Sequence, residues 1–244
     1  QRQMCIRDRY TQSAGWYTHY GYNNCYFADF TLMFSASNKL DPNSRWKPAP
    51  TVGLSWVISN EDFMKNQNII DFMKLRASFG IINTDNTPYD GYWHEDLVTG
   101  GSTYPIVGGD NFGNGDGGWA EARLASVNGV LEKAYKYNVG LDVSLLKGLN
   151  FSIDGFYERR SDIWVDASGR NSSVLGISSP YANAGIVDSW GTELGLDYSK
   201  QIGDFKLRVG GTYSFNRNEI IENLEEPKPY EYLSAVGRPI GQVW

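Results

Sequence analysis

The residues that could carry out acid–base or nucleophilic chemistry are few and widely spaced in this sequence. His19 and His94 are the only histidines, and neither a Gly-x-Ser-x-Gly nor a His-Glu-x-x-His pattern occurs. A hydrolase triad and a zinc-peptidase helix are therefore not expected. A pair of carboxylates could still hydrolyse a glycoside, and the nominal candidates are Glu121, Glu132, Asp154 and Glu158. We favour the alternative that these carboxylates line a wet interior, and we predict that the chain is not an enzyme.

Metal and cofactor chemistry has equally little support. The acidic, glycine-rich run from Gly109 to Gly117 suggests a calcium loop, but Phe112 and Gly113 interrupt the alternating oxygen ligands that such a loop requires. A glycine-rich external loop is the better interpretation. The two cysteines, Cys5 and Cys25, cannot build a disulfide framework, and no Cys or His pair has zinc spacing. No metal or other cofactor is predicted.

Aromatic rings offer a different chemistry, because their faces can stack on sugar rings. The segment 83–135 is rich in them, and the candidate ligand contacts are Tyr89, Tyr92, Trp93 and Trp119. The competing interpretation, which we favour, is that these rings pack the loop against its neighbours.

Composition narrows the partners. The net charge is -6, which argues against nucleic acid, since phosphate binding requires clustered Lys and Arg. Aromatic residues make up 14% of the chain and there are 27 glycines, a combination typical of strands and tight turns. No apolar run is long enough for a membrane helix. A neutral sugar or peptide ligand remains possible.

The elements that must position these residues are strands, because apolar and polar side chains alternate with a period of two. The clearest alternating runs lie at 73–81, 137–145, 192–198 and 205–215. Further strands are expected at about 14–22, 25–37, 51–58 and 150–159. The only helical candidate is the short segment from Asn60 to Lys65, whose Asn could cap it.

The connections between these strands alternate in length. The shorter links are 23–24, 59–69, 147–149 and 201–203, and the longer ones are about 38–50, 83–135, 160–189 and 217 onward. Outer-membrane barrels have short periplasmic turns and long external loops. Aromatic residues near strand ends, such as Trp16, Tyr22, Tyr26, Trp56, Trp164 and Trp190, are also typical of membrane interfaces.

We therefore predict an all-β fold, an antiparallel up-and-down meander that forms part of a large transmembrane β-barrel wall. The alternative is a soluble, extracellular glycan-binding β-sandwich or propeller, because alternation alone also fits a sheet with one wet face. Residues 1–9 lack the apolar core of a signal peptide and are expected to be a non-native or disordered leader. Residues 10–244 are expected to form a partial barrel domain, without a plug domain and without the terminal strands.

Several segments, in this order, resemble the SusC-like (SusC/RagA) branch of TonB-dependent outer-membrane transporters. The segments are Asn43 to Ser59, Met73 to Gly80, Leu131 to Asp142, Asn183 to Leu194 and Gly237 to Gly241. Two departures are Leu131, where the family usually has Trp, and Asn38 to Pro42, which replace an Arg-Asp-Gly-Ser-Ser turn. Each segment is weak alone, but their order and spacing together are specific.

The resemblance implies a barrel of about 22 strands around a plug, located in the bacterial outer membrane and driven by TonB through an N-terminal part that this chain lacks. It also implies a SusD-like surface lipoprotein as partner, contact with outer-membrane lipid, and an oligosaccharide or peptide as cargo. On this interpretation the chain is a segment of a nutrient importer.

Overall fold

The computed structural model describes residues 10–85, 94–104, 116–126, 129–146, 148–167 and 181–242. Eight long strands form one antiparallel sheet in the order β1-β2-β3-β4-β7-β8-β9-β10. Their bounds are β1 Thr11–Tyr22, β2 Tyr26–Ser37, β3 Lys47–Val57, β4 Ile70–Thr84, β7 Glu132–Leu145, β8 Leu149–Asp166, β9 Tyr181–Ile202 and β10 Phe205–Glu222. Apart from the β4 to β7 connection, each strand pairs with the next one along the chain, which confirms the predicted up-and-down meander.

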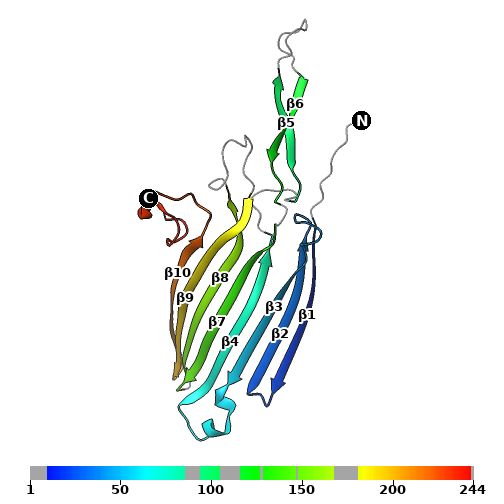
Figure 1. The fold of residues 1–244 in the computed structure, drawn as a ribbon. Coiled ribbons are helices and arrows are strands. Elements are labelled where there is room, and N and C mark those ends of the chain that lie inside the picture. Colours follow the sequence, from blue (N-terminus) through cyan, green and yellow to red (C-terminus); the bar gives the residue numbers. More distant parts are fainter. Residues whose placement is uncertain are drawn as a thin grey trace.

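The connections are sorted by length at the two ends of the sheet (Figure 1). Residues 23–25, 58–69, 146–148 and 203–204 connect strands at the lower end, and residues 38–46, 85–131 and 167–180 connect them at the upper end. The turn between β1 and β2 places Asn23 and Asn24 at φ values of 50° and 53°. Asn tolerates this left-handed backbone, which matches the twist of the flanking strands.

The strands are longer than the sequence pattern predicts. β9 has 22 residues and both β8 and β10 have 18. The predicted loop 160–189 was therefore too wide, since β8 continues to Asp166 and β9 begins at Tyr181. Arg160 and the register shift that follows it, between Arg160 and Ile163, hide the alternation there, although Arg160 stays in register with β9.

The long connection between β4 and β7 contains a feature that the alternation did not reveal. β5 (Leu97–Tyr104) and β6 (Asp116–Arg123) pair as a separate two-stranded antiparallel sheet. Figure 1 shows this hairpin rising beyond the upper end of the main sheet. The longest predicted loop thus extends the molecule on the side where the other long loops lie.

Helical structure in the described residues is limited to three short 3-10 helices, η1 (Ile58–Asn60), η2 (Asp62–Met64) and η5 (Glu231–Leu233). The predicted capping by Asn60 is wrong, because its side-chain amide instead donates to the Asn24 carbonyl at 2.7 Å. That bond joins the two neighbouring lower turns. Within the described ranges, no helix has the length and apolar character that membrane crossing requires.

A small apolar core lies at the upper end of the sheet, where the loops begin. Leu40, Leu131 and Trp164 are buried together, and Tyr181 packs against them. The predicted interface role of Trp164 is therefore wrong, because its side chain is only 7% exposed. Leu131, at the position where the resembling family usually has Trp, is part of this core, so the position is still filled by a buried apolar side chain.

Candidate functional site on the concave face of the sheet

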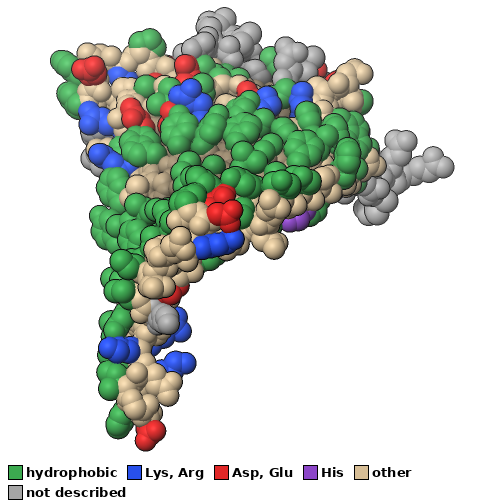
Figure 2. Space-filling view, turned by 90° about the horizontal axis from the view of Figure 1, so that it is seen from below, with side chains coloured by type: hydrophobic (Ala, Val, Ile, Leu, Met, Phe, Trp, Pro, Cys, Tyr) green, Lys and Arg blue, Asp and Glu red, His purple; other side chains and the backbone are tan. Residues whose placement is uncertain are grey.

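The two faces of the main sheet have opposite chemistry. Most side chains on the convex face are apolar, and many remain exposed because no second layer covers them among the described residues; the exposed ones include Trp16, Tyr20, Tyr26, Leu54, Leu75, Val139, Leu196, Val209 and Tyr213. Figure 2 shows hydrophobic side chains gathered along this side. An exposed apolar surface of this extent requires an apolar environment, and a lipid-facing barrel wall provides one.

Aromatic residues border this apolar surface at two heights. Near the lower turns, the Tyr26 and Trp56 rings stack with centroids 6.1 Å apart. Higher up, Tyr137 contacts both Phe79, at 4.9 Å, and Tyr157, at 6.0 Å between ring centroids. On β7 the apolar row runs from Tyr137 to Leu145, which matches the roughly 9 to 11 residues of a membrane-crossing strand. Such aromatic girdles are typical of outer-membrane barrels.

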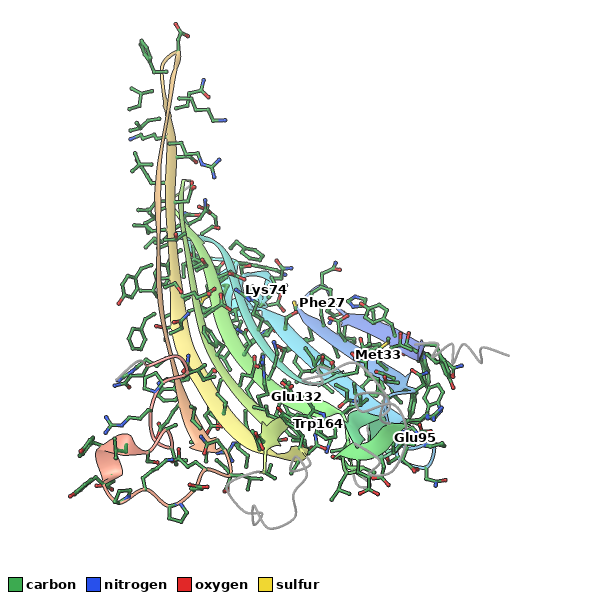
Figure 3. All side chains as sticks on the ribbon, turned by 90° about the horizontal axis from the view of Figure 1, so that it is seen from above. Phe27, Met33, Lys74, Glu95, Glu132 and Trp164 are labelled. Atoms are coloured by element: carbon green, nitrogen blue, oxygen red, sulfur yellow. The ribbon has the colours of Figure 1, made fainter. Side chains whose placement is uncertain are left out.

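The concave face carries the charges. Figure 3 shows Lys74 on this side of the curved sheet. Register places eight further charged side chains of β4 to β10 on the same face: Arg76, Lys136, Asp142, Asp154, Glu158, Glu193, Asp197 and Arg208. A closed barrel with this curvature would have these residues in its lumen.

One guanidinium joins three strands on this face. Arg76 in β4 donates from Nε to Asp142 Oδ2 in β7 at 3.0 Å, and from Nη2 to Asp154 Oδ2 in β8 at 2.7 Å. The second oxygen of Asp154 is buried and has no hydrogen-bond partner. This network fixes the side chains in the middle of the wall.

Gly140 makes the Arg76 network possible. It lies between Arg76 and Asp154 in the register, so the guanidinium crosses directly over it. A Cβ atom at this position would lie 2.7 Å from Arg76 Cζ and 2.6 Å from Asp154 Oδ1. Gly140 therefore does more than provide a non-apolar position between Val139 and Leu141: its lack of a side chain leaves room for the guanidinium.

A second charged cluster lies higher on the same face. Arg160 contacts Glu132 Oε1 at 3.3 Å and Glu158 Oε1 at 3.1 Å, while Lys136 contacts Glu158 Oε2 at 3.1 Å. Glu132 is only 3% exposed, so a neighbouring cation is needed to stabilise its charge. The buried carboxylate of Glu132 in β7 is thus paired with Arg160 of the neighbouring strand β8.

The carboxylates considered for glycoside hydrolysis are therefore spread along the sheet and do not converge on one cleft. Asp154, Glu132 and Glu158 all lie on the concave face, each paired with an Arg or Lys. Glu121 lies on the separate hairpin, in β6. This arrangement agrees with carboxylates that line a wet interior.

The predicted aromatic contact residues are only partly within the described structure. Trp119 belongs to β6 and pairs with Gly100 of β5. Tyr89, Tyr92 and Trp93 lie outside the described residues, as does most of the glycine-rich run 109–117. Among the side chains that the structure does describe, no group of three or more His, Cys, Asp and Glu could hold a metal ion.

An ordered loop follows β10, which the sequence pattern did not predict. The Glu225 carboxylate accepts hydrogen bonds from the Ser234 hydroxyl and from the backbone N–H of Ala235, at 3.0 Å. These bonds, led by the one from Ser234, lower the pKa of Glu225. The backbone of Gly237 and Arg238 then pairs with Ile220 of β10. The only sequence signal was the Gly237 to Gly241 segment, whose glycines have φ values of 80° and 79° at Gly237 and Gly241.

The segment from Asn183 to Leu194, which resembles the family, has a structural role at the upper end of the sheet. The Asn183 side chain accepts from the Val130 N–H at 2.9 Å and donates to the Asp162 carbonyl at 2.7 Å. It thereby ties the start of β7 to the irregular part of β8, which contains a register shift between Arg160 and Ile163. Gly185 allows this irregular backbone to approach, because a Cβ there would lie 2.9 Å from Ile163 Cβ.

Comparison with known proteins gives a consistent result. TonB-dependent receptor P39 of Formosa agariphila is 29% identical over 233 residues, covering 92% of this chain and 21% of that protein. TonB-dependent receptor SusC of Bacteroides thetaiotaomicron is 26% identical over 213 residues, covering 83% of this chain and 20% of SusC. This chain therefore spans about a fifth of the length of these relatives.

Solved structures show the same fold. The RagAB peptide importer in its open-open state superposes with a TM-score of 0.74 at 22% identity, covering 88% of this chain and 22% of that chain. In its closed-closed state the TM-score is 0.71 at 23% identity, with 86% and 22% covered. These matches agree with an open segment of a larger barrel, in which β1 and β10 are not paired with each other.

The family model for "TonB dependent receptor-like, beta-barrel" matches residues 7–243, which is nearly the whole chain. Together with the SusC and RagAB matches, it confirms the resemblance to SusC-like transporters that the sequence segments indicated, and with it the outer-membrane location. The chain belongs to the TonB-dependent receptor β-barrel family.

Proposed function

We propose that this chain is part of the wall of a nutrient importer in the bacterial outer membrane, with an oligosaccharide or peptide as cargo. The observation that carries the proposal is the opposite chemistry of the two faces of the main sheet, which is clearest from β4 to β10. The convex face is apolar and exposed, and the concave face carries paired charges. Membership of the receptor family and the likeness to SusC and RagAB support it.

The physical division of labour follows from this geometry. Lipid covers the convex face, because exposed Leu, Val, Tyr and Trp side chains are favourable in contact with acyl chains, whereas in water such a surface would cause the protein to aggregate. The concave face lines the lumen, where ion pairs such as Arg76 with Asp154 and Lys136 with Glu158 remain hydrated and hold the wall rigid. In this proposal the carboxylates stabilise the barrel wall through ion pairs, and the chain carries out no catalysis.

The soluble alternative predicted a sandwich or propeller, in which the apolar side chains of one sheet pack against another layer. In the described ranges the main sheet is a single layer, and its apolar face is not packed against β5 or β6 (Figure 1). The length-sorted loops also favour the membrane protein. We therefore do not retain the soluble binding module.

TonB and a SusD-like surface lipoprotein are the partners that we propose for the intact importer. SusC is called a TonB-dependent receptor, and RagAB is described as a peptide importer. TonB would act through a part of the protein outside this chain, and a lipoprotein would act at the upper rim, where the long loops gather. Nucleic acid is not among the proposed partners.

The function is tested by deleting the gene for the complete transporter and measuring growth and uptake on a panel of oligosaccharides and peptides. We expect loss of uptake for one cargo class, with the same loss in a strain that lacks TonB. Co-purification of an affinity-tagged transporter from solubilised outer membranes tests the lipoprotein partner. Undiminished uptake of every cargo in the deletion strain would refute the importer assignment.

Cargo contact by Tyr89, Tyr92, Trp93 and Trp119 is a further part of the proposal, since all four belong to the long upper connection. The combined change Trp93→Ala and Trp119→Ala is expected to weaken cargo binding, measured by isothermal titration with the purified transporter. Phe63→Ala is the matched control, because Phe63 is an exposed aromatic residue, 67% accessible, at the lower end. Unchanged cargo affinity in the double variant would contradict cargo contact and leave only the packing role for these rings.

A further inference from the structure

An apolar groove of ≈350 Å³ lies on the convex face of β1 to β4. Tyr20, Tyr26 and Trp56 stand around it, while Ala28 and Ala77 pair on either side of Leu54 and leave the surface hollow. All of these residues belong to the apolar rows of the convex face. The groove is therefore a depression in the membrane-facing surface of the wall.

The groove has a defined height in the membrane. Tyr20 and Tyr26 flank the turn between β1 and β2, and Trp56 is the penultimate residue of β3, so the groove lies at the end with the short turns. In an outer-membrane barrel this end is periplasmic. The lipids available at this height are the diacyl phospholipids of the periplasmic leaflet.

One wall of the groove is held in place by a hydrogen bond and by ring stacking. The Trp56 indole donates to Glu61 Oε1 at 2.9 Å, and the Tyr26 and Trp56 rings are nearly parallel, at 8°. Glu61 lies in the lower turn, between η1 and η2. The rings thus form a fixed lateral wall, which distinguishes this hollow from the mobile side chains of an ordinary lipid-facing surface.

Charges of both signs lie just beyond the periplasmic end of the groove. Lys65 contacts Asp62 at 2.5 Å, and their side chains are 65% and 94% exposed. Such an exposed pair contributes little stability, so both groups can exchange their partner. A zwitterionic headgroup presents the complementary set, a phosphate for Lys65 and an ammonium group for Asp62 or Glu61.

We propose that this groove binds one acyl chain of a periplasmic-leaflet phospholipid, with its headgroup at the turn that carries Glu61, Asp62 and Lys65. The chain fills the hollow above Ala28 and Ala77 and packs against the Tyr26 and Trp56 rings. The inference rests on the outer-membrane location and not on import, so its failure would leave the proposed function standing.

The test uses the complete transporter, purified from outer membranes in a mild detergent and weighed by native mass spectrometry. We expect a phospholipid to remain bound to the wild type and the bound fraction to fall severalfold in Ala28→Leu, which fills the groove. Ala14→Leu is the matched control, because Ala14 is an alanine on the convex face of β1, opposite Phe34, and does not line the groove. Equal retention in both variants, or retained lipopolysaccharide instead of phospholipid, would overturn the proposal.

A second measurement does not depend on the folding of a groove-filling variant. Wild-type transporter is incubated with phosphatidylethanolamine brominated in its acyl chains and then exchanged into lipid-free detergent. We expect residual quenching of tryptophan fluorescence in the wild type and much less in Trp56→Phe, which keeps an aromatic wall but removes the reporter. Equal residual quenching in the two proteins would show that no chain stays beside Trp56, and would also overturn the proposal.

Discussion

The substitution Gly140→Ala tests whether the concave face is held by the Arg76 network. Adding one methyl group places a carbon 2.7 Å from Arg76 Cζ and 2.6 Å from Asp154 Oδ1, so the guanidinium must move away from the sheet. Its contact with Asp154 Oδ2, at 2.7 Å, is the bond most directly affected. Asp154 would then lose its partner while its other oxygen already lacks one.

The magnitude follows from opposing terms. A hydrogen bond to a charged group contributes about 1.5 to 3 kcal/mol, and the lower part of that range applies because the Arg76 side chain is 36% exposed. Replacing Gly by Ala in extended backbone returns about 0.4 to 1 kcal/mol through the unfolded state. We therefore expect Gly140→Ala to lower the free energy of unfolding by about 0.5 to 1.5 kcal/mol.

The assay is urea unfolding of the complete transporter in detergent micelles, followed by tryptophan fluorescence. Gly155→Ala is the control, since Gly155 lies in the adjacent strand β8 and a Cβ there would meet nothing within 4 Å. It should be neutral or slightly stabilising. A double-mutant cycle with Arg76→Ala completes the test, because the cost of Gly140→Ala should largely disappear once the guanidinium is removed. An unchanged cost in that background would refute the reasoning.

Three other outcomes are expected. Asp188→Asn should lower the free energy of unfolding by about 1 to 2 kcal/mol, because Asp188 accepts two bonds of 2.8 Å from Arg159 and one of 2.9 Å from the Tyr157 hydroxyl; the urea assay measures this, and no change would mean that the rim does not depend on the pair. Glu225→Gln should speed hydrogen exchange at the Ala235 amide, which donates to that carboxylate at 3.0 Å; an unaltered exchange rate would contradict the clamp. In the native protein this protection should be complete above the usual Glu pKa of about 4.3 and be lost as pH falls through the lowered pKa of Glu225. Exchange measured from about pH 6 down to pH 3 should show this loss, and protection that is already lost above about pH 4.3 would be inconsistent with a lowered pKa.

The sequence alone identified the strands whose alternation is uninterrupted. The row from Tyr137 to Leu145 has apolar residues at every second position, and such a row can form only a one-sided strand, whatever surrounds it. The loop sorting was equally readable, because the distance between successive alternating runs is a property of the chain. From these two signals the up-and-down meander followed, and the family segments added the identity of the barrel.

The ends of the strands were not readable in the same way. β8 continues through Arg159 and Arg160, although neither fits an alternating apolar pattern, because its partners in β9 continue the ladder. The β5 and β6 hairpin is glycine-rich and lacks alternation, so only the pairing of Leu97 with Arg123 and of the residues that follow reveals it. Backbone pairing partners are set by the whole sheet, and local residue types do not report them.

The candidate site shows the same division. That Asp154 and Glu158 face the wet side was inferred from the sequence, because alternation determines which face a side chain occupies. Which base holds each acid depended on neighbours separated by many residues: Arg76 reaches Asp154 across the intervening strand β7, and only because Gly140 between them has no side chain. A periodic pattern specifies the direction of a side chain, whereas its contacts are decided by the register between strands, which exists only in the folded sheet.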